Sequence, residues 1–327
     1  MLFKMMFTIL LMSSTMFVIS SSSWFLMWIG LEINLLAIIP LLNSKKNLLS
    51  TESTMKYFIT QALASTMILF TIISFFTNFS WLNYLMWTSL LTKLGMAPFH
   101  FWLPEIIEGL NWMNSLLILT WQKISPMIMI SYSINFNYFF YSIIIISLLI
   151  SGILGINQIS LRKILTYSSI NHMSWMISSM MISKNIWIYY FIIYTIISFN
   201  IIIMFKEIHV YYFQQLFLML NNHLTLKIFF SLNLLSLSGI PPFLGFIAKW
   251  VIIENLLLNQ FFLMTILMIF MTMVTMYFYM RILFTMFMIN MNEMNYLPPK
   301  FNYNKIMLFN FMTIISFMFY SINFLNF

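Results

Sequence analysis

Four ionisable side chains lie inside long apolar stretches of the chain: Glu32, Lys93, Lys123 and Lys249. On insertion scales, such a residue costs roughly 2.5 to 3.5 kcal/mol at the centre of a membrane helix. The four together cost on the order of 10 kcal/mol, which makes an accidental origin implausible. Since a carboxylate and three amines can take up and release protons, these residue types predict proton transfer or charge pairing.

Two of these lysines adjoin sequences that break a helix. Lys93 precedes Gly95-Met96-Ala97-Pro98-Phe99, and 144 residues later Gly239-Ile240-Pro241-Pro242-Phe243 precedes Lys249. Broken helices in corresponding positions are typical of ion paths, because freed carbonyls and water can accommodate a charge. Glu105 and Lys249 each stand six residues after the Phe of their own break, so the two positions correspond. We expect five residues to form the breaks: Gly95, Pro98, Gly239, Pro241 and Pro242.

Each buried group also has a simpler interpretation. Glu32 can form an inert internal salt bridge, Lys123 can reach water along a tilted helix, and Lys249 can be an interfacial anchor. His172 lies among residues with hydroxyl and amide groups, where it can hold a water chain or act as a hydrogen-bonded packing group. The sequence leaves these two roles of His172 open.

Composition restricts the class of protein. Of the 327 residues, 62% are hydrophobic and 7% are charged, and the mean hydropathy is +0.94. This leaves too little polar surface to cover a soluble globule. The lack of Cys and Asp excludes iron–sulfur ligation, thiol catalysis and an Asp-based metal site, and the seven glycines form no phosphate-binding loop. We therefore expect a membrane protein without a cofactor of its own and without a nucleic-acid partner.

Apolar runs of about 20 residues predict eleven membrane spans in an all-α fold. The first five form one repeat at 1–135, the next five form a second repeat at 138–285, and a further helix lies at 306–325. Because each repeat holds an odd number of spans, the second is inserted upside down relative to the first. The expected spans are 5–20, 24–42, 57–76, 81–103, 114–134, 138–156, 164–182, 186–205, 228–252, 258–280 and 306–325.

Basic residues orient these spans. Lys184 alone falls on one side, whereas eleven basic residues fall at the N-terminus or in loops that follow even-numbered spans. The positive-inside rule places that second side in the matrix or cytoplasm and the C-terminus opposite. The eleven residues are Lys4, Lys45, Lys46, Lys56, Arg162, Lys163, Lys206, Lys227, Arg281, Lys300 and Lys305.

Five segments carry a family resemblance: residues 28–32, 91–105, 121–126, 165–173 and 237–246. They resemble the mitochondrially encoded chain 2 family of NADH:ubiquinone oxidoreductase, the respiratory complex I, in its insect form. The segments around Lys93 and Gly239 are the most specific, because they are long and correctly ordered. The resemblance covers essentially the whole chain.

This resemblance implies an antiporter-like fold, in which the broken helices flank a hydrated path at mid-membrane. By position, Glu32 and Lys93 correspond to the family's buried glutamate–lysine pair, Lys123 to its central lysine and Lys249 to the lysine of the second half. Thr166 and Ser174 stand where the family more often has small apolar residues. These two departures make the neighbourhood of His172 more polar.

The resemblance also implies a function: a redox-free core subunit of the membrane arm that couples quinone reduction to proton translocation. FMN, iron–sulfur clusters and ubiquinone would belong to other subunits. The expected partners are other membrane-arm subunits, notably chains 4 and 4L, supernumerary subunits, and phospholipids including cardiolipin. The implied location is the mitochondrial inner membrane, with the N-terminus in the matrix and the C-terminus in the intermembrane space. The 32 Met residues fit a mitochondrial genetic code.

Three other classes compete with this interpretation. A cation/proton antiporter subunit would share the fold and would exchange ions without NADH. A structural membrane-arm scaffold would tolerate neutral residues at its buried charged positions. A haem-bearing quinol enzyme would need paired axial histidines, and only His100 could accompany His172 within the spans.

Overall fold

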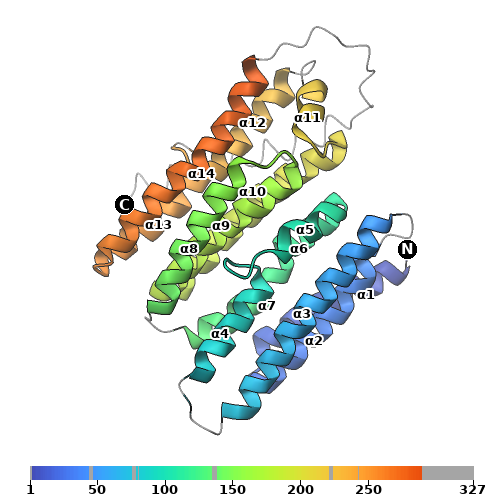
Figure 1. Cartoon of the computed structure of the whole chain (residues 1–327), viewed down its shortest axis with the longest axis vertical. Helices are drawn as coiled ribbons and strands as arrows, with labels where there is room; N and C mark the ends of the chain where they lie inside the picture. Colours follow the sequence, from blue (N-terminus) through green and yellow to red (C-terminus); the bar gives the residue numbers. More distant parts are fainter. Residues whose placement is uncertain are drawn as a thin grey trace. The chain divides into compact units, whose positions relative to one another are not determined.

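The computed structural model describes residues 2–43, 47–75, 79, 81–134, 138–220, 224–241 and 243–288. Over these residues the chain is almost entirely helical (Figure 1). It divides into two compact units, Met1–Phe136 and Asn137–Phe327, and each is described by itself. The predicted span at 306–325 and the basic residues Lys45, Lys46, Lys300 and Lys305 lie outside the described residues.

The first unit is built around three long helices that pack in chain order. Helix α2 packs on both α1 and α3, and α3 also packs on α4 and α5. Four shorter helices and a 3-10 turn complete the described part of the unit. The elements are α1 (Leu2–Ser20), α2 (Trp24–Leu42), α3 (Leu48–Ser74), α4 (Trp81–Leu94), α5 (Trp102–Gly109), α6 (Trp112–Leu119), the 3-10 turn η2 (Trp121–Lys123) and α7 (Ile124–Ser133).

The second unit surrounds one central helix, α9. This helix packs against α8, α10, α13 and α14, while α12 packs against α10, α13 and α14. The elements are α8 (Tyr138–Ile156), α9 (Leu161–Ile182), α10 (Lys184–Ile208), α11 (Phe213–Leu220), α12 (Leu224–Ser238), α13 (Leu244–Leu258) and α14 (Phe262–Met288).

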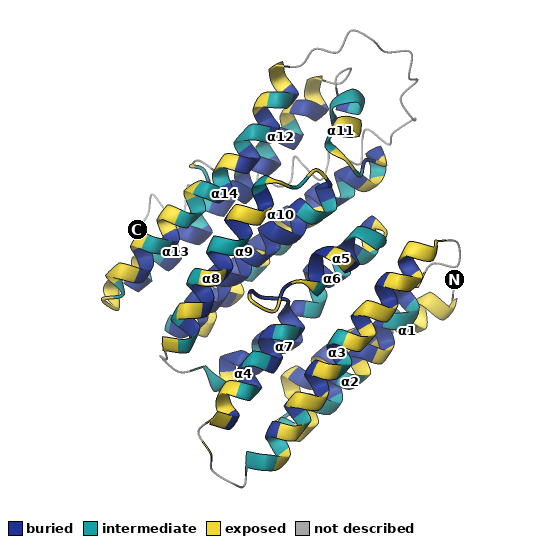
Figure 2. Cartoon of the chain, viewed as in Figure 1, coloured by how far each residue is buried: buried dark blue, intermediate teal, exposed yellow. Residues whose placement is uncertain are grey.

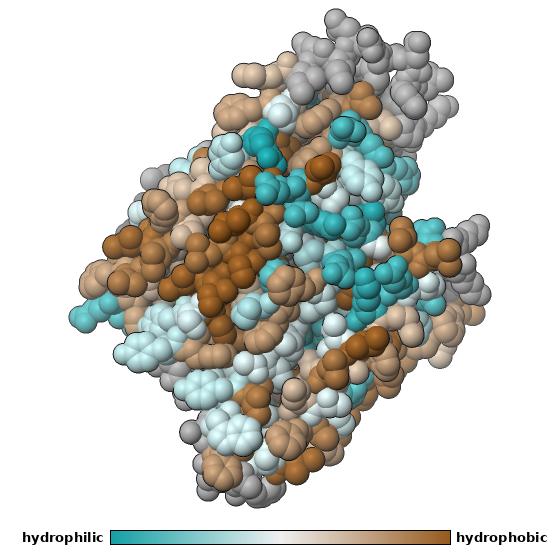
Figure 3. Space-filling view, in the orientation of Figure 1, coloured by the Kyte–Doolittle hydropathy of each residue, from teal (hydrophilic) through white to brown (hydrophobic). Residues whose placement is uncertain are grey.

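The outer faces of both units are apolar. Six of the described helices, α1, α2, α3, α8, α10 and α14, are long and apolar enough to cross a membrane. Figure 2 shows exposed stretches along α1, α3 and α14. The exposed apolar side chains of α3 and α14 include Leu63, Phe70 and Phe270. In Figure 3 a continuous hydrophobic area lies over α8. Exposed apolar surface of this extent is unfavourable in water and favourable in lipid, so the fold is that of a multi-pass membrane protein.

Helix α9 is rich in polar residues and yet is buried on every side from Leu161 to Met181, apart from its first basic residues. Its hydroxyl groups donate hydrogen bonds to carbonyl oxygens three residues earlier in the same helix. Examples are Thr166 to Lys163, 2.6 Å, and Ser168 to Leu165, 2.7 Å. Because these local bonds satisfy the hydroxyls, a polar helix can occupy the centre of a membrane unit.

The helix boundaries agree with the expected spans where the apolar run defines the whole helix. Helices α2 and α8 have the predicted limits. Helix α3 begins at Leu48 rather than at residue 57, because its first turns carry Glu52 and Lys56 and extend beyond the apolar run. Helix α11, within the predicted polar loop 206–227, was not expected.

Candidate functional site

The first helix break ends α4. Gly95 adopts a left-handed conformation with φ +72°. The N–H groups of Gly95 and Met96 donate to the carbonyls of Thr92 and Leu91, each at 3.1 Å, which is the hydrogen-bond pattern of a Schellman cap. A Cβ atom on Gly95 would lie 3.1 Å from the Trp102 ring, so this position needs glycine for both conformation and space. Pro98 lies in the turn between α4 and α5.

Side chains from neighbouring helices satisfy the freed carbonyls at the end of α4. The Trp102 indole N–H of α5 donates to the Thr92 carbonyl at 2.9 Å. The Gln61 amide of α3 donates to the Lys93 carbonyl at 3.3 Å. The break in the first unit is therefore stabilised by neutral donors, and the Lys93 ammonium takes no part in it.

The second break ends α12 in the same way. Gly239 has φ +79°, and the N–H groups of Gly239 and Ile240 donate to the carbonyl of Leu235 at 3.1 and 3.4 Å. Here Lys249 is only 6% exposed, and its ammonium donates to the Ser238 carbonyl at 2.8 Å. Lys249 thus caps the broken helix with its own charge. Pro241 follows in the turn, and Pro242 lies outside the described residues.

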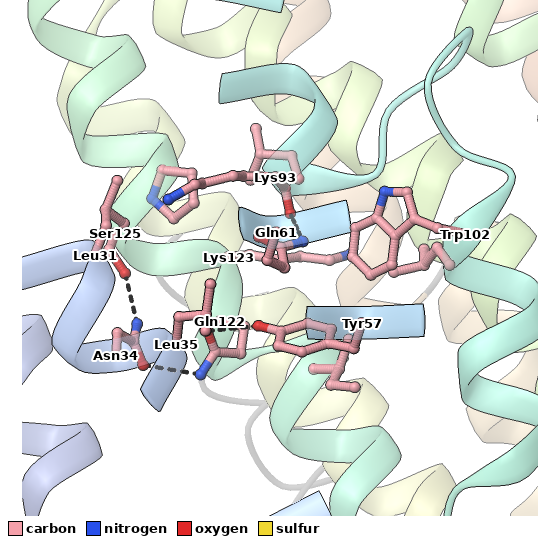
Figure 4. Close-up of a pocket in the computed structure, with 14 residues that line it drawn as sticks. Leu31, Asn34, Leu35, Tyr57, Gln61, Lys93, Trp102, Gln122, Lys123 and Ser125 are labelled. Atoms are coloured by element: carbon pink, nitrogen blue, oxygen red, sulfur yellow. Dashed lines mark hydrogen bonds between the residues drawn. The ribbon is translucent and has the colours of Figure 1, made fainter. Parts of the chain in front are cut away.

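Lys93 and Lys123 line one small cavity in the first unit. They are 7% and 2% exposed, and the cavity has a volume of about 20 Å³, enough for about one water molecule. Polar side chains from four elements surround the two lysines, as Figure 4 shows. These are Asn34, Tyr57, Gln61, Gln122 and Ser125.

Three hydrogen bonds connect these polar side chains (Figure 4). The Gln122 amide donates to the Asn34 carbonyl oxygen at 2.9 Å, and the Asn34 amide donates to the Ser125 hydroxyl at 3.1 Å. The Tyr57 hydroxyl donates to the Gln122 carbonyl oxygen at 3.4 Å. This network, which no local pattern in the sequence indicates, ties α2 and α3 to the segment that carries Lys123.

The segment around Lys123 is itself interrupted. The sequence predicted one continuous span at 114–134, and this was wrong, because α6 ends at Leu119 and a 3-10 turn precedes α7. Pro126 has no N–H to donate to the carbonyl of Gln122, and its ring disfavours a regular α-helix there. Lys123 therefore lies, like Lys93, next to irregular backbone.

Glu32 lies on α2 and is partly buried. Among the described residues, the ion pairs join Lys56 to Glu52 and to Glu105, each at 3.0 Å, and none includes Glu32. The carboxylate of Glu32 is nevertheless within electrostatic range of Lys93. In this structure the expected glutamate–lysine pair interacts through space rather than by direct contact.

His172 of α9 is buried beside two tyrosines of α10. Its Nδ1 lies 2.8 Å from the Tyr190 hydroxyl, and its ring centroid lies 5.0 Å from that of Tyr194. The neighbouring hydroxyls that the sequence suggested as partners, such as Ser169 and Ser174, donate to their own helix backbone. Tyr190 and Tyr194 are one helical turn apart and so share a face of α10, but no signal in the sequence identifies His172 as their partner.

One expectation about a charged residue was wrong. The apolar runs place Lys227 in a loop between two spans, yet it lies in the first turns of α12, is 8% exposed, and has its ammonium 5.3 Å from the centroid of the Phe287 ring. Glu105, whose position after its break corresponds to that of Lys249, is exposed and pairs with Lys56. Glu105 and Lys249 thus occupy corresponding positions after the two breaks, but Glu105 is exposed and Lys249 is buried.

The comparisons with known proteins agree with this architecture. The family described as NADH:quinone oxidoreductase/Mrp antiporter, transmembrane region, matches residues 21–83 and 76–275. NADH-ubiquinone oxidoreductase chain 2 of Anopheles gambiae is 45% identical over 325 residues, 94% of each chain. The chain 2 protein of Aedes aegypti is 44% identical over 323 residues, 95% of this chain and 94% of that one.

The fold is similar to that of a chain in the respiratory complex I of Thermus thermophilus. The TM-score is 0.87, with 18% identity, over 98% of this chain and 79% of that chain. The antiporter-like helical fold expected from the sequence is thereby confirmed, and the identity over nearly the whole length confirms the expected relatives. The chain belongs to the NADH-ubiquinone oxidoreductase chain 2 family, within the wider family of NADH:quinone oxidoreductase and Mrp antiporter membrane subunits.

Proposed function

We propose that the chain is a redox-free core subunit of the membrane arm of respiratory complex I, and that it couples quinone reduction to proton translocation. The observation that carries this proposal is the cavity shared by Lys93 and Lys123, since two buried amines around space for one water can exchange a proton. The 45% identity to a chain 2 protein over nearly its whole length favours this function over that of an antiporter subunit.

In this proposal Glu32, Lys93, Lys123, His172 and Lys249 carry the proton-transfer steps. Glu32 acts on Lys93 through its charge, and His172 works together with Tyr190. The two helix breaks, which begin at Gly95 and Gly239 and include Pro98 and Pro241, supply irregular backbone beside the lysines. The similar glycine caps of α4 and α12 support the interpretation of the two units as inverted repeats.

The setting of the chain is part of the same proposal. It lies in the mitochondrial inner membrane, with its N-terminus in the matrix and its C-terminus in the intermembrane space. Its partners are other complex I subunits, notably chains 4 and 4L, together with supernumerary subunits and phospholipids including cardiolipin. FMN, iron–sulfur clusters and ubiquinone belong to other subunits. The asymmetric distribution of basic residues in the sequence supports the orientation.

The substitution Lys93→Met tests the function. In assembled complex I reconstituted into vesicles, we expect fewer protons translocated per NADH oxidised. The reason is that methionine keeps the volume of the lysine side chain but cannot bind or release a proton. The matched control is Lys184→Met, since Lys184 is an exposed lysine at the start of α10. An unchanged proton yield in an assembled Lys93→Met complex would leave this chain as a structural scaffold.

A further inference from the structure

A groove of about 380 Å³ opens at one end of the second unit, and Lys249 is not among the residues that line it. Its walls come from the last turn of α8 and the loop that follows, from α11, and from the C-terminal part of α14, which Figure 1 shows at the same end of this unit. The side chains that matter for recognition are Asn157, Gln158, Phe213, Phe217, Arg281 and Thr285.

Backbone hydrogen bonds and a contact between aromatic rings hold the walls of the groove in place. The N–H of Leu161 donates to the Tyr211 carbonyl at 3.0 Å, and Ser160 pairs with Tyr212 in an isolated β-bridge. These bonds fix the loop after α8 to the segment that leads into α11. The rings of Phe213 and Phe217 stack on each other, with centroids 6.2 Å apart, and form an apolar wall.

Arg281 supplies the charge of the groove. The Nη2 group of Arg281 donates a hydrogen bond to the carbonyl of Ile156, at the end of α8. This bond orients the guanidinium. Among the described residues, the two ion pairs both belong to Lys56, so no carboxylate in this part of the chain neutralises Arg281. A planar guanidinium with donors left over is well suited to the oxygens of a phosphate group.

The surface beside the groove is apolar. Ile153 on the last turns of α8 is 60% exposed, and Phe284, one turn after Arg281 on α14, is 56% exposed. A ligand that places a phosphate at Arg281 could therefore lay hydrocarbon along these helices. Asn157, Gln158 and Thr285 offer hydrogen bonds for the polar atoms between the two ends.

We infer that this groove binds the phosphodiester headgroup of an anionic phospholipid, with Arg281 as the phosphate ligand and the acyl chains along α8 and α14. Basic pockets between membrane helices are suited to such headgroups, because the charge attracts the lipid and the apolar flanks retain it. The inference rests on the proposed membrane setting of the chain and is independent of the proton-transfer residues.

The test is lipid binding to assembled, detergent-delipidated complex I, with phosphatidylglycerol or phosphatidylcholine added in mixed micelles and bound lipid counted by native mass spectrometry. Arg281→Gln should weaken phosphatidylglycerol binding about tenfold, because it removes a charge-assisted contact to the phosphate, and it should remove the preference of the groove for phosphatidylglycerol over phosphatidylcholine. Arg281→Lys should retain part of the affinity. Lys184→Gln, which removes a charge elsewhere on the surface, should have no effect.

A second measurement covers the case in which Arg281→Gln fails to assemble. A photoactivatable phosphatidylglycerol, added to the wild-type complex, should label residues 156–159 or 213–217 and should not be displaced by inorganic phosphate at equal concentration. Labelling that avoids both segments would overturn the inference, as would full displacement by inorganic phosphate or equal lipid binding in Arg281→Gln and wild type. The number of protons per NADH at saturating lipid reports separately on the proposed function.

Discussion

The Lys249 ammonium donates a hydrogen bond to the backbone carbonyl of Ser238, at 2.8 Å, where helix α12 breaks. The same ammonium lies 5.8 Å from the centroid of the Trp175 ring. In the first unit, by contrast, the carbonyls at the end of α4 are satisfied by Trp102 and Gln61. One broken helix is therefore capped by the charge that we propose to carry a proton, and the other is capped by neutral groups.

This relationship predicts the effect of Gly239→Ala. Gly239 has φ +79°, and an added Cβ would lie 2.9 Å from the Lys249 ammonium nitrogen. The left-handed conformation costs a non-glycine residue about 1 to 2 kcal/mol, and the contact would push Lys249 away from Ser238. We expect a lower melting temperature of the assembled complex and fewer protons per NADH, measured in vesicles.

Gly95→Ala provides the matched comparison. Its φ of +72° carries a similar conformational cost, but its Cβ would meet the Trp102 ring instead of a lysine. We expect a similar loss of stability with a smaller loss of proton yield. Equal proton yields in Gly239→Ala and wild type, in complexes that assemble, would show that the Lys249 cap has no role in translocation.

The hydrogen-bond network beside Lys123 gives the second prediction. Gln122→Leu removes the donor to Asn34 and the acceptor for Tyr57, which leaves two buried polar groups unsatisfied. Each such group costs about 1 to 3 kcal/mol, so we expect the 3-10 turn that carries Lys123 to shift. Thermal unfolding of the complex and its proton yield should both decrease. Gln214→Leu, at an exposed position on α11, should change neither.

Backbone signals were the most predictable part of this chain. Glycine at positive φ and proline without an N–H act locally, so the sequence alone placed the ends of α4 and α12. Continuous apolar runs likewise defined α2 and α8. These features depend on residues close together in sequence, and a single sequence contains that information.

Contacts between distant helices could not be predicted. The network around Gln122 joins residues 65 to 91 positions apart, and no periodicity in one sequence indicates such partners. Lys227 was placed in a loop because its flanks are polar, whereas packing of α12 against α14 buries it near Phe287. Tyr190, which lies beside His172, likewise comes from another helix, and the sequence alone could not identify it as a partner.

The pairing of His172 with Tyr190 gives the third prediction. Tyr190→Phe keeps the buried ring and removes only the hydroxyl that lies 2.8 Å from Nδ1 of His172. A packing role predicts a loss of about 1 kcal/mol in stability and nothing more. We expect a decrease in proton yield as well, because the pair would transfer protons. Tyr277→Phe on α14, at an exposed tyrosine, is the control, and a proton yield equal to that of the control would leave His172 with a packing role.

The last prediction concerns Glu32 and Lys93, which interact without direct contact in this structure. The carboxylate of Glu32 acts electrostatically on Lys93, yet no ion pair joins them among the described residues. If the charge of Glu32 affects proton transfer chiefly by acting on Lys93, removing the Glu32 charge should hardly change the proton yield once Lys93 has been replaced by a neutral residue. The double variant Glu32→Gln with Lys93→Met should then have nearly the same proton yield as Lys93→Met alone.

The measurement is a double-mutant cycle on the proton yield per NADH and on the turnover rate of assembled complex I. Glu32→Gln alone should lower both values, and assembly should be less affected, because Glu32 is only partly buried and takes part in no ion pair within the described residues. Two unit charges several ångströms apart at an effective dielectric of about 20 interact by a few kcal/mol, so coupling between the sites should be readily measurable. Fully additive losses would instead show that the two charges act independently, and Glu32 would then contribute to proton transfer by a route that does not include Lys93.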